Sequence, residues 1–322
     1  MRRIGILTSG GDAPGMNAAI RATVRSALNY GIEVYGIECG YEGLVKGTLY
    51  NMDRRSVSDT IQKGGTILKT ARCPEFMEKE TRQKAYDVLQ AYGIEGLVVI
   101  GGDGSFRGMN DLYNDFGVPC VGIPGTIDND LAYTDYTLGF DTAVNTVLSA
   151  VNNIRDTMTA HNRACIIEVM GRKCGDIAVY AGLAGGAEII LVPEIPMDLN
   201  KVCTTIRQDK IKGKNSVIII LAEGVCTCAE LKEKILEQVT DLSIRTVKLG
   251  YLQRGGTPSM ADRILAARCG MRAVELLKNG DCGGRVVGIK DNKIIDLPID
   301  EALATPRKFD KELYKIAEVL GK

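Results

Sequence analysis

The chain has 322 residues, and its 40 lysines and arginines balance its 40 aspartates and glutamates. This zero net charge argues against a nucleic-acid partner, because such proteins draw most of their affinity from basic residues that neutralise phosphates. The longest apolar run, Val217–Ala222, is far shorter than the roughly 20 residues of a membrane-spanning helix. The N-terminal residues also lack the apolar stretch of a secretory signal. We therefore expect a globular, cytoplasmic protein of about two domains, without membrane contact.

Short apolar runs alternate with amphipathic stretches along the whole chain. The apolar runs predict strands at 3–8, 33–37, 97–100, 120–123, 164–169, 189–191, 217–222 and 286–289. The amphipathic stretches predict helices at 16–30, 80–92, 141–158, 199–211, 229–239 and 261–277. Continuous apolar strands that alternate with helices indicate an α/β fold with mainly parallel sheets and right-handed crossovers.

Four glycine-rich loops follow predicted strands, at 9–15, 101–105, 124–130 and 170–175. The first opens the helix at Met16, and the second opens a helix near Phe106. Glycine lets backbone N–H groups approach a phosphate, and a helix N-terminus favours negative charge. Four such loops indicate phosphate-bearing ligands. Neither a P-loop motif nor G-x-G-x-x-G occurs, although Gly10, Gly11, Gly15 and Glu38 roughly imitate a dinucleotide site, so an oxidoreductase is a weaker alternative.

The carboxylates of these loops suit phosphoryl transfer. Asp103 lies between glycines, where it can reach a metal-bound nucleotide phosphate. Asp128 and Asp130 are two residues apart, so in an extended stretch both would face one side, one as a base and the other orienting it or holding Mg²⁺. An Asp-rich turn is the alternative. Because His161 is the single histidine, acid–base work falls mainly on other side chains.

Arginines lie in or beside the loops, at Arg72, Arg163, Arg172, Arg245 and Arg254. Each could be a solvated surface charge. As a set, they indicate anionic ligands bound in a bidentate manner.

Five segments together resemble the bacterial ATP-dependent 6-phosphofructokinases of the single-unit form. They are Ile4–Asn17, Gly101–Ser105, Pro124–Asp130, Met170–Arg172 and Gln253–Gly256. The order GGDGS then PGTIDND is highly specific, and the resemblance covers nearly the whole chain. It implies two similar-sized Rossmann-like domains of three layers with the active site in the cleft between them. Residues 1–139 and 252–305 would bind ATP, and residues 140–251 and 306–322 the sugar phosphate.

The resemblance implies phosphoryl transfer from Mg-ATP to the 1-hydroxyl of fructose 6-phosphate, the committed step of glycolysis. In it, Asp128 is the base and Arg172 stabilises the transferring phosphoryl group, while Thr126 and Asp130 hold the reacting end of the sugar. The ATP-binding residues are Gly11, Tyr41, Arg72, Cys73, Gly102, Asp103, Gly104 and Ser105, with Asp103 serving Mg²⁺. The remaining sugar-binding residues are Met170, Gly171, Glu223, Tyr251 and Arg254, with Arg163 and Arg245 reaching across from a neighbouring subunit of a homotetramer.

Two glycines favour ATP as the donor. Pyrophosphate-dependent relatives resemble this pattern but carry Asp and Lys at the places of Gly104 and Gly125, and an Asp at 104 would crowd and repel the α-phosphate of ATP. A pyrophosphate-dependent or altered-sugar kinase is the nearest alternative. A non-catalytic, nucleotide-binding regulatory paralogue is the alternative from another class.

The resemblance also implies an effector site for ADP as activator or phosphoenolpyruvate as inhibitor. Its residues are Arg21, Arg25, Arg54, Asp59, Arg155, Glu188, Lys212 and Lys214. The chain departs from the family at Tyr251 and Ser216, where histidines are usual. A tyrosine can donate a hydrogen bond but adds no positive charge, so we expect altered sugar affinity with less pH dependence. Unchanged Michaelis constants in Tyr251→His would show that this departure has no consequence.

Overall fold

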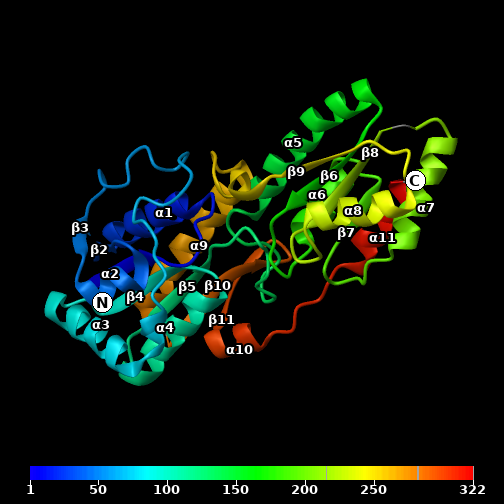
Figure 1. Ribbon diagram of the computed structural model, residues 1–322. Coiled ribbons are helices and arrows are strands. Elements are labelled where there is room, and N and C mark those ends of the chain that lie inside the picture. Colours follow the sequence, from blue (N-terminus) through cyan, green and yellow to red (C-terminus); the bar gives the residue numbers. More distant parts are fainter. Residues whose placement is uncertain (215, 281–282, 322) are drawn as a thin grey trace. The chain divides into compact units, whose positions relative to one another are not determined.

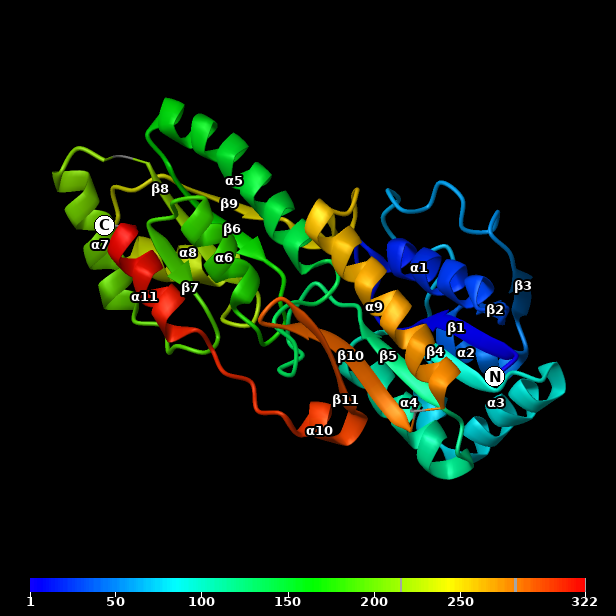
Figure 2. The same cartoon turned by 180° about the vertical axis from the view of Figure 1, so that it is seen from behind.

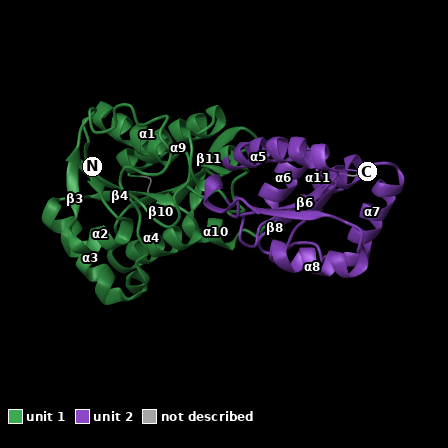
Figure 3. Cartoon of the chain, turned by 45° about the horizontal axis from the view of Figure 1, so that its top comes forward, with its two compact units in different colours: residues 1–127, 131–142, 254–307 green, residues 128–130, 143–253, 308–322 purple. Residues whose placement is uncertain are grey.

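The computed structural model describes residues 1–214, 216–280 and 283–321 (Figure 1). The chain divides into two compact units (Figure 3). Unit 1 comprises residues 1–127, 131–142 and 254–307, and unit 2 comprises residues 128–130, 143–253 and 308–322. These borders lie within a few residues of the predicted domain borders, except that 128–130 falls in unit 2 and not with its flanking residues.

Unit 1 contains a seven-stranded sheet with the order β11-β10-β5-β4-β1-β2-β3. Its strands are β1 (Arg3–Thr8), β2 (Glu33–Ile37), β3 (Leu49–Met52), β4 (Gly96–Gly101), β5 (Cys120–Pro124), β10 (Gly284–Lys290) and β11 (Lys293–Pro298). Its helices are α1 (Met16–Asn29), α2 (Gly40–Lys46), α3 (Lys79–Tyr92), α4 (Asp103–Phe116), α9 (Met260–Asn279) and α10 (Ile299–Ala304), with the 3₁₀ turn η1 (Pro74–Met77). The inner strands pair in parallel, and only the edge strands β3 and β11 run antiparallel to their neighbours.

Helices cover both faces of this sheet. Helices α1 and α9 lie on one face, and α2, α3, α4 and α10 lie on the other (Figures 1 and 2). Phe106 and Met109 of α4 pack there in one apolar core with Leu7 and Val99 of the strands. Because β1 and β4 are neighbours whose following helices cover opposite faces, the loops after them meet at the carboxyl edge of the sheet. Open α/β sheets bind ligands at that position.

Unit 2 contains a four-stranded parallel sheet with the order β7-β8-β6-β9. Its strands are β6 (Ala164–Val169), β7 (Ile189–Leu191), β8 (Val217–Ala222) and β9 (Ile244–Lys248). Its helices are α6 (Asp176–Ala184), α7 (Leu199–Ile211), α8 (Cys228–Gln238) and α11 (Lys311–Leu320), with most of α5 (Phe140–His161) and of the 3₁₀ turn η2 (Gly250–Arg254). Val202 of α7 and Ile235 of α8 pack in one apolar core with Ile166 and Ile219 of the strands.

The predicted α/β class with mainly parallel sheets is confirmed, as are all eight predicted strands and six predicted helices to within a few residues. Two expectations are wrong in detail. The units differ in size, with seven strands in one sheet and four in the other. Helix α4 begins at Asp103 and not near Phe106, so Gly104 and Ser105 lie in its first turn. Within the described ranges, no helix has the length and hydropathy to span a bilayer.

Candidate active site

The first two glycine loops of unit 1 lie against each other. The Ser9 N–H donates to the Ile100 carbonyl (2.9 Å), which joins the ends of β1 and β4. A Cβ at Gly101 would lie 2.6 Å from the Ser9 carbonyl oxygen, so the close approach requires glycine. A Cβ at Gly104, in contrast, would meet nothing within 4 Å. The N-terminus of α4 therefore faces open space, where backbone N–H groups and the helix dipole favour a phosphate.

Asp103 stands on the first turn of α4 and pairs with a residue that the sequence analysis did not select. Arg107 Nε lies 3.1 Å from Asp103 Oδ2, and Arg107 Nη2 lies 3.2 Å from Asp103 Oδ1. The Asp103 side chain is 48% exposed. The carboxylate is accessible to a cation, and one carboxylate combined with nucleotide phosphate oxygens is a ligand set that Mg²⁺ accepts.

Three of the predicted ATP-binding residues lie at different depths. Tyr41 is buried, stacks on Phe76 with 4.1 Å between ring centroids, and donates its hydroxyl proton to the Ser105 carbonyl (2.5 Å). Burial raises the pKa of Tyr41 well above its ordinary value, which keeps the hydroxyl a donor. Tyr41 thus anchors the first turn of α4 through the Ser105 carbonyl. Arg72 is exposed, and Cys73 is half-buried at the start of η1.

Arg254, predicted to bind the sugar, belongs to unit 1 and lies on the first loop. Its Nη2 is 2.6 Å from Asp12 Oδ1, and a Cβ at Gly11 would lie 2.8 Å from that same Nη2. Thr126 lies on the neighbouring loop, where its carbonyl accepts from the Thr137 hydroxyl (2.6 Å) and its Cβ lies 3.8 Å from the position of a Cβ at Gly102. Unit 1 therefore places Gly11, Gly102, Thr126 and Arg254 on adjoining loops.

In unit 2 two of the four predicted catalytic residues, Asp128 and Arg172, come together. Arg172 Nε lies 3.3 Å from Asp128 Oδ2, and the Arg172 N–H donates to Glu223 Oε1 (2.9 Å). The Asp128 side chain is 8% exposed, whereas that of Arg172 is 68% exposed. The carboxylate is therefore buried, and the exposed guanidinium that contacts it can reach an anionic ligand.

Both loops that carry these residues contain left-handed backbone. Asn129 has a φ of 52° and Arg172 a φ of 54°, a conformation that costs about 1–2 kcal/mol for a residue with a Cβ. The condition of an extended stretch from Asp128 to Asp130 is not met, since the chain bends at 127–128 and Asn129 is left-handed. The Asn129 amide donates to Asp176 Oδ2 (3.0 Å), which docks this turn on the start of α6.

The fourth loop is held by one buried and one half-buried side chain. The Met170 N–H donates to Gln253 Oε1 (3.2 Å), and the Gly175 N–H donates to Glu194 Oε1 (2.9 Å). Gly171 has a φ of 130°, and a Cβ there would lie 2.3 Å from the Cys174 carbonyl oxygen. Gln253 is fully buried, and the sequence motif Gln253–Gly256 gives no sign of this supporting role. Cys174, Asp176 and Glu194 have ligand atoms within 4.8 Å of one another, but two of them already hold loops by the bonds above.

Arg245 and Arg163 are predicted to reach a neighbouring subunit, and Arg245 lies on the open edge of the unit 2 sheet. Arg245 is exposed on the edge strand β9, paired in register with Cys165 of β6. Arg163 immediately precedes β6 and is half-buried. Tyr251 follows β9 in η2 and is 79% exposed. All three are therefore accessible, as contact with a ligand or a second chain requires.

Three predicted effector residues form one cluster in unit 2. Glu188, whose side chain is 2% exposed, lies 3.3 Å from Arg155 Nη1 and 2.7 Å from Lys214 Nζ, and accepts from the Ile218 N–H (2.6 Å). Lys212 caps α7 two residues before Lys214. Ser216 lies 3.4 Å from the Thr159 hydroxyl. The other four residues belong to unit 1, with Arg21 and Arg25 on α1 and Arg54 and Asp59 in the segment after β3.

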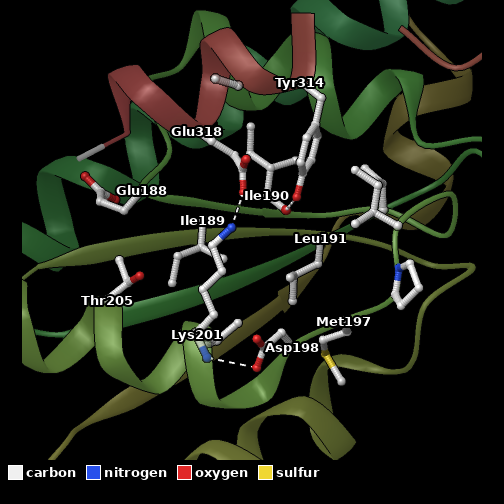
Figure 4. A pocket seen from close by; sticks show the side chains of 15 residues that line it. Glu188, Ile189, Ile190, Leu191, Met197, Asp198, Lys201, Thr205, Tyr314 and Glu318 are labelled. Carbon is white, nitrogen blue, oxygen red and sulfur yellow. Dashed lines mark hydrogen bonds and ion pairs between the residues drawn. The ribbon is translucent and has the colours of Figure 1, made fainter. Parts of the chain in front are cut away.

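A cavity of about 250 Å³ lies in unit 2 between β7, α7 and α11. Its walls are mainly apolar, and Figure 4 shows Tyr314 turned toward Ile190 and Lys201 toward Glu318. The hydroxyl of Tyr314 donates to the Ile190 carbonyl (3.0 Å). Among the described residues that line it, Glu188 alone belongs to a predicted site, so this cavity is separate from the glycine loops.

The chain matches a known protein family over most of its length. The family described as Phosphofructokinase matches residues 3–277. The chain is 60% identical over its full length to the full-length ATP-dependent 6-phosphofructokinase of Clostridium acetobutylicum, and 58% identical over the full length of both chains to that of Clostridium botulinum. Phosphofructokinase from Saccharomyces cerevisiae superimposes with a TM-score of 0.90 at 33% identity, covering 99% of this chain and 48% of the yeast chain.

Proposed function

The chain belongs to the phosphofructokinase family, and we propose that it transfers the γ-phosphoryl group of ATP to the 1-hydroxyl of fructose 6-phosphate. The products are fructose 1,6-bisphosphate and ADP. The observation that carries this proposal is the recessed Asp128 carboxylate with Arg172 Nε 3.3 Å from it. When an alcohol attacks a phosphoryl group, a base takes up its proton and a nearby exposed cation stabilises the negative charge of the transferring group.

The proposed reaction assigns one role to each of these side chains. Asp128 accepts the proton of the 1-hydroxyl while the bond from O1 to the γ-phosphorus forms. The bond from that phosphorus to the bridging oxygen breaks, and ADP leaves with the electron pair. Arg172 turns from Asp128 toward the transferring group and stabilises its negative charge, the largest contribution expected in such a reaction. Thr126 and Asp130 position the reacting end of the sugar.

The rest of the sugar is assigned to the other residues predicted to bind it. Glu223 accepts a hydrogen bond from the Arg172 N–H and would also accept one from a sugar hydroxyl. The further contacts are assigned to Met170, Gly171, Tyr251 and Arg254. We assign Arg245, on the edge strand β9, and Arg163, just before β6, to the sugar phosphate of a neighbouring subunit in a homotetramer. Sedimentation of the purified protein as a monomer with full activity would contradict this assignment.

ATP is assigned to the loops of unit 1, with its phosphates over the first turn of α4 and in reach of Arg72. Asp103 would hold Mg²⁺, which neutralises phosphate charge and orients the triphosphate when it is bound. The open space beside Gly104 and the exposed carboxylate support this position. We also propose a cytoplasmic location, because the ten cysteines of the sequence are scattered and form no C-x-x-C pair, as suits a protein of a reducing compartment.

The test is Asp128→Asn in a coupled assay with ATP and fructose 6-phosphate. Loss of the base should lower kcat at least ~10²-fold. KM for ATP should stay within about threefold, since the groups assigned to ATP lie in unit 1. The exposed Glu42→Gln serves as the matched control. A variant as fast as wild type removes Asp128 from its role, and a wild type that binds ATP without turnover favours the regulatory paralogue.

We further propose that Glu188, Arg155 and Lys214 belong to a site for an anionic effector, ADP or phosphoenolpyruvate. A buried carboxylate holds the two cations in place, ready for phosphate oxygens. In Glu188→Gln, the ratio of activity with effector to activity without it should move toward one. Lys210→Met removes another cation from the same region and should keep the wild-type ratio. An unchanged ratio in Glu188→Gln excludes this cluster from regulation.

A further inference from the structure

Arg107 stands on α4 four residues after Asp103, so both side chains lie on one face of the helix. Its guanidinium contacts both oxygens of the carboxylate, at 3.1 Å and 3.2 Å. The two side chains are 61% and 48% exposed, so the pair faces solvent and can open. The proposed mechanism gives Arg107 no role.

This contact occupies the same oxygens that a nucleotide-bound metal would need. Asp103 lies at the N-terminus of α4, where the space beside Gly104 is open and phosphates are expected. An unpaired carboxylate at that point would repel a triphosphate. Either a guanidinium or a divalent cation can neutralise it, and both act on one carboxylate. A guanidinium and a metal ion would therefore need the same carboxylate oxygens.

We propose that Arg107 is the counter-ion of Asp103 when no metal is bound. It thereby sets how strongly nucleotide binding depends on the metal, and this inference rests on the proposed ATP site. Without metal, Arg107 neutralises Asp103 and allows the phosphates to approach. With metal-loaded nucleotide, Arg107 releases at least one carboxylate oxygen and its guanidinium remains beside the phosphates. Arg107 is thus a positioning residue for the donor.

The test measures binding by calorimetry, without sugar and without turnover. A non-hydrolysable ATP analogue is titrated into wild type and Arg107→Met, with Mg²⁺ and again with a chelator. In Arg107→Met, the Kd of the metal-free analogue should rise about threefold to fivefold more than the Kd of the Mg²⁺ form, as expected for the loss of one exposed charge pair. Arg107→Lys keeps the charge and should fall between wild type and Arg107→Met.

Lys46→Met is the matched control, because Lys46 forms an exposed ion pair four residues from Glu42 on α2 of the same unit. It should leave the ratio of the two Kd values at the wild-type level. An equal change of both Kd values in Arg107→Met, or no change, overturns the role of Arg107 alone. A wild type that binds the analogue under neither condition overturns the proposed ATP site as well.

Discussion

The Glu168 carboxylate of β6 lies 2.8 Å from Lys248 Nζ on the neighbouring edge strand β9, although the Glu168 side chain is only 4% exposed. Its other oxygen accepts the N–H of Cys228, the first residue of α8 (3.0 Å). Burial raises the pKa of Glu168, but the hydrogen bonds from Lys248 and Cys228 lower it by more, so it lies below its ordinary value of 4.5. One carboxylate thus joins an edge strand and a helix to the centre of the sheet.

This relationship predicts a pH-dependent contribution to stability. A lowered pKa in the folded state means that the contribution is fully present above pH 4.5 and is lost as the pH falls through the folded-state pKa. Glu168→Gln should cost about 1–3 kcal/mol of unfolding free energy at pH 7. The gap from wild type should close in denaturant titrations below pH 4.5. A gap that persists at low pH would contradict the charge argument.

Because the backbone of Arg172 is left-handed, we expect two substitutions there to lower activity equally but stability unequally. Arg172→Gly and Arg172→Ala both remove the guanidinium, so both should lower kcat at least ~10²-fold. Glycine accepts a φ of 54° without strain, and alanine does not. The glycine variant should therefore be more stable than the alanine variant by about 1 kcal/mol in urea titrations. Equal stability would show that this φ costs the fold nothing.

Gly104 predicts that ATP use can be lost while the fold stays intact. Because a Cβ at Gly104 meets nothing within 4 Å, Gly104→Asp should unfold at the wild-type temperature. Its carboxylate would crowd and repel the nucleotide, so kcat/KM for ATP should fall at least about tenfold. Gly125→Ala is the contrasting variant, since its Cβ would lie 2.9 Å from Ile100 Cγ2 and should cost about 1–3 kcal/mol by overpacking. Full ATP use by Gly104→Asp would remove the steric argument for the donor.

The sequence predicts the inner strands well because they are buried on both faces. Strands β4 and β8 are continuous apolar runs, so their position does not depend on recognising a period. The edge strand β9 was missed because Arg245, Thr246 and Lys248 face solvent and hide the pattern. Helix α6 was missed for the opposite reason, since DIAVYAGLA is apolar on nearly every side and shows no helical period.

The candidate site was predictable in its residues but not in its backbone. Glycine spacing and carboxylate placement identified Asp103 and Asp128. The residue type of Asn129 is the one local signal for its left-handed backbone, whereas its bond to Asp176, far along the chain, has no local signal. Arg107 carried an available signal, an opposite charge four residues after Asp103 on a helix. An expected helix start after Ser105 leaves Asp103 outside the helix, so this four-residue spacing has no meaning there.

The division of the chain has a consequence for its synthesis. Unit 1 is complete only when residues through 307 have been made, and unit 2 still needs 308–322. That last segment carries α11, whose Tyr314 bonds the edge strand β7 at Ile190. Because each unit is assembled from separate stretches, its first apolar strands are made well before the last segments that complete its core. These strands must therefore be kept from aggregating in that interval.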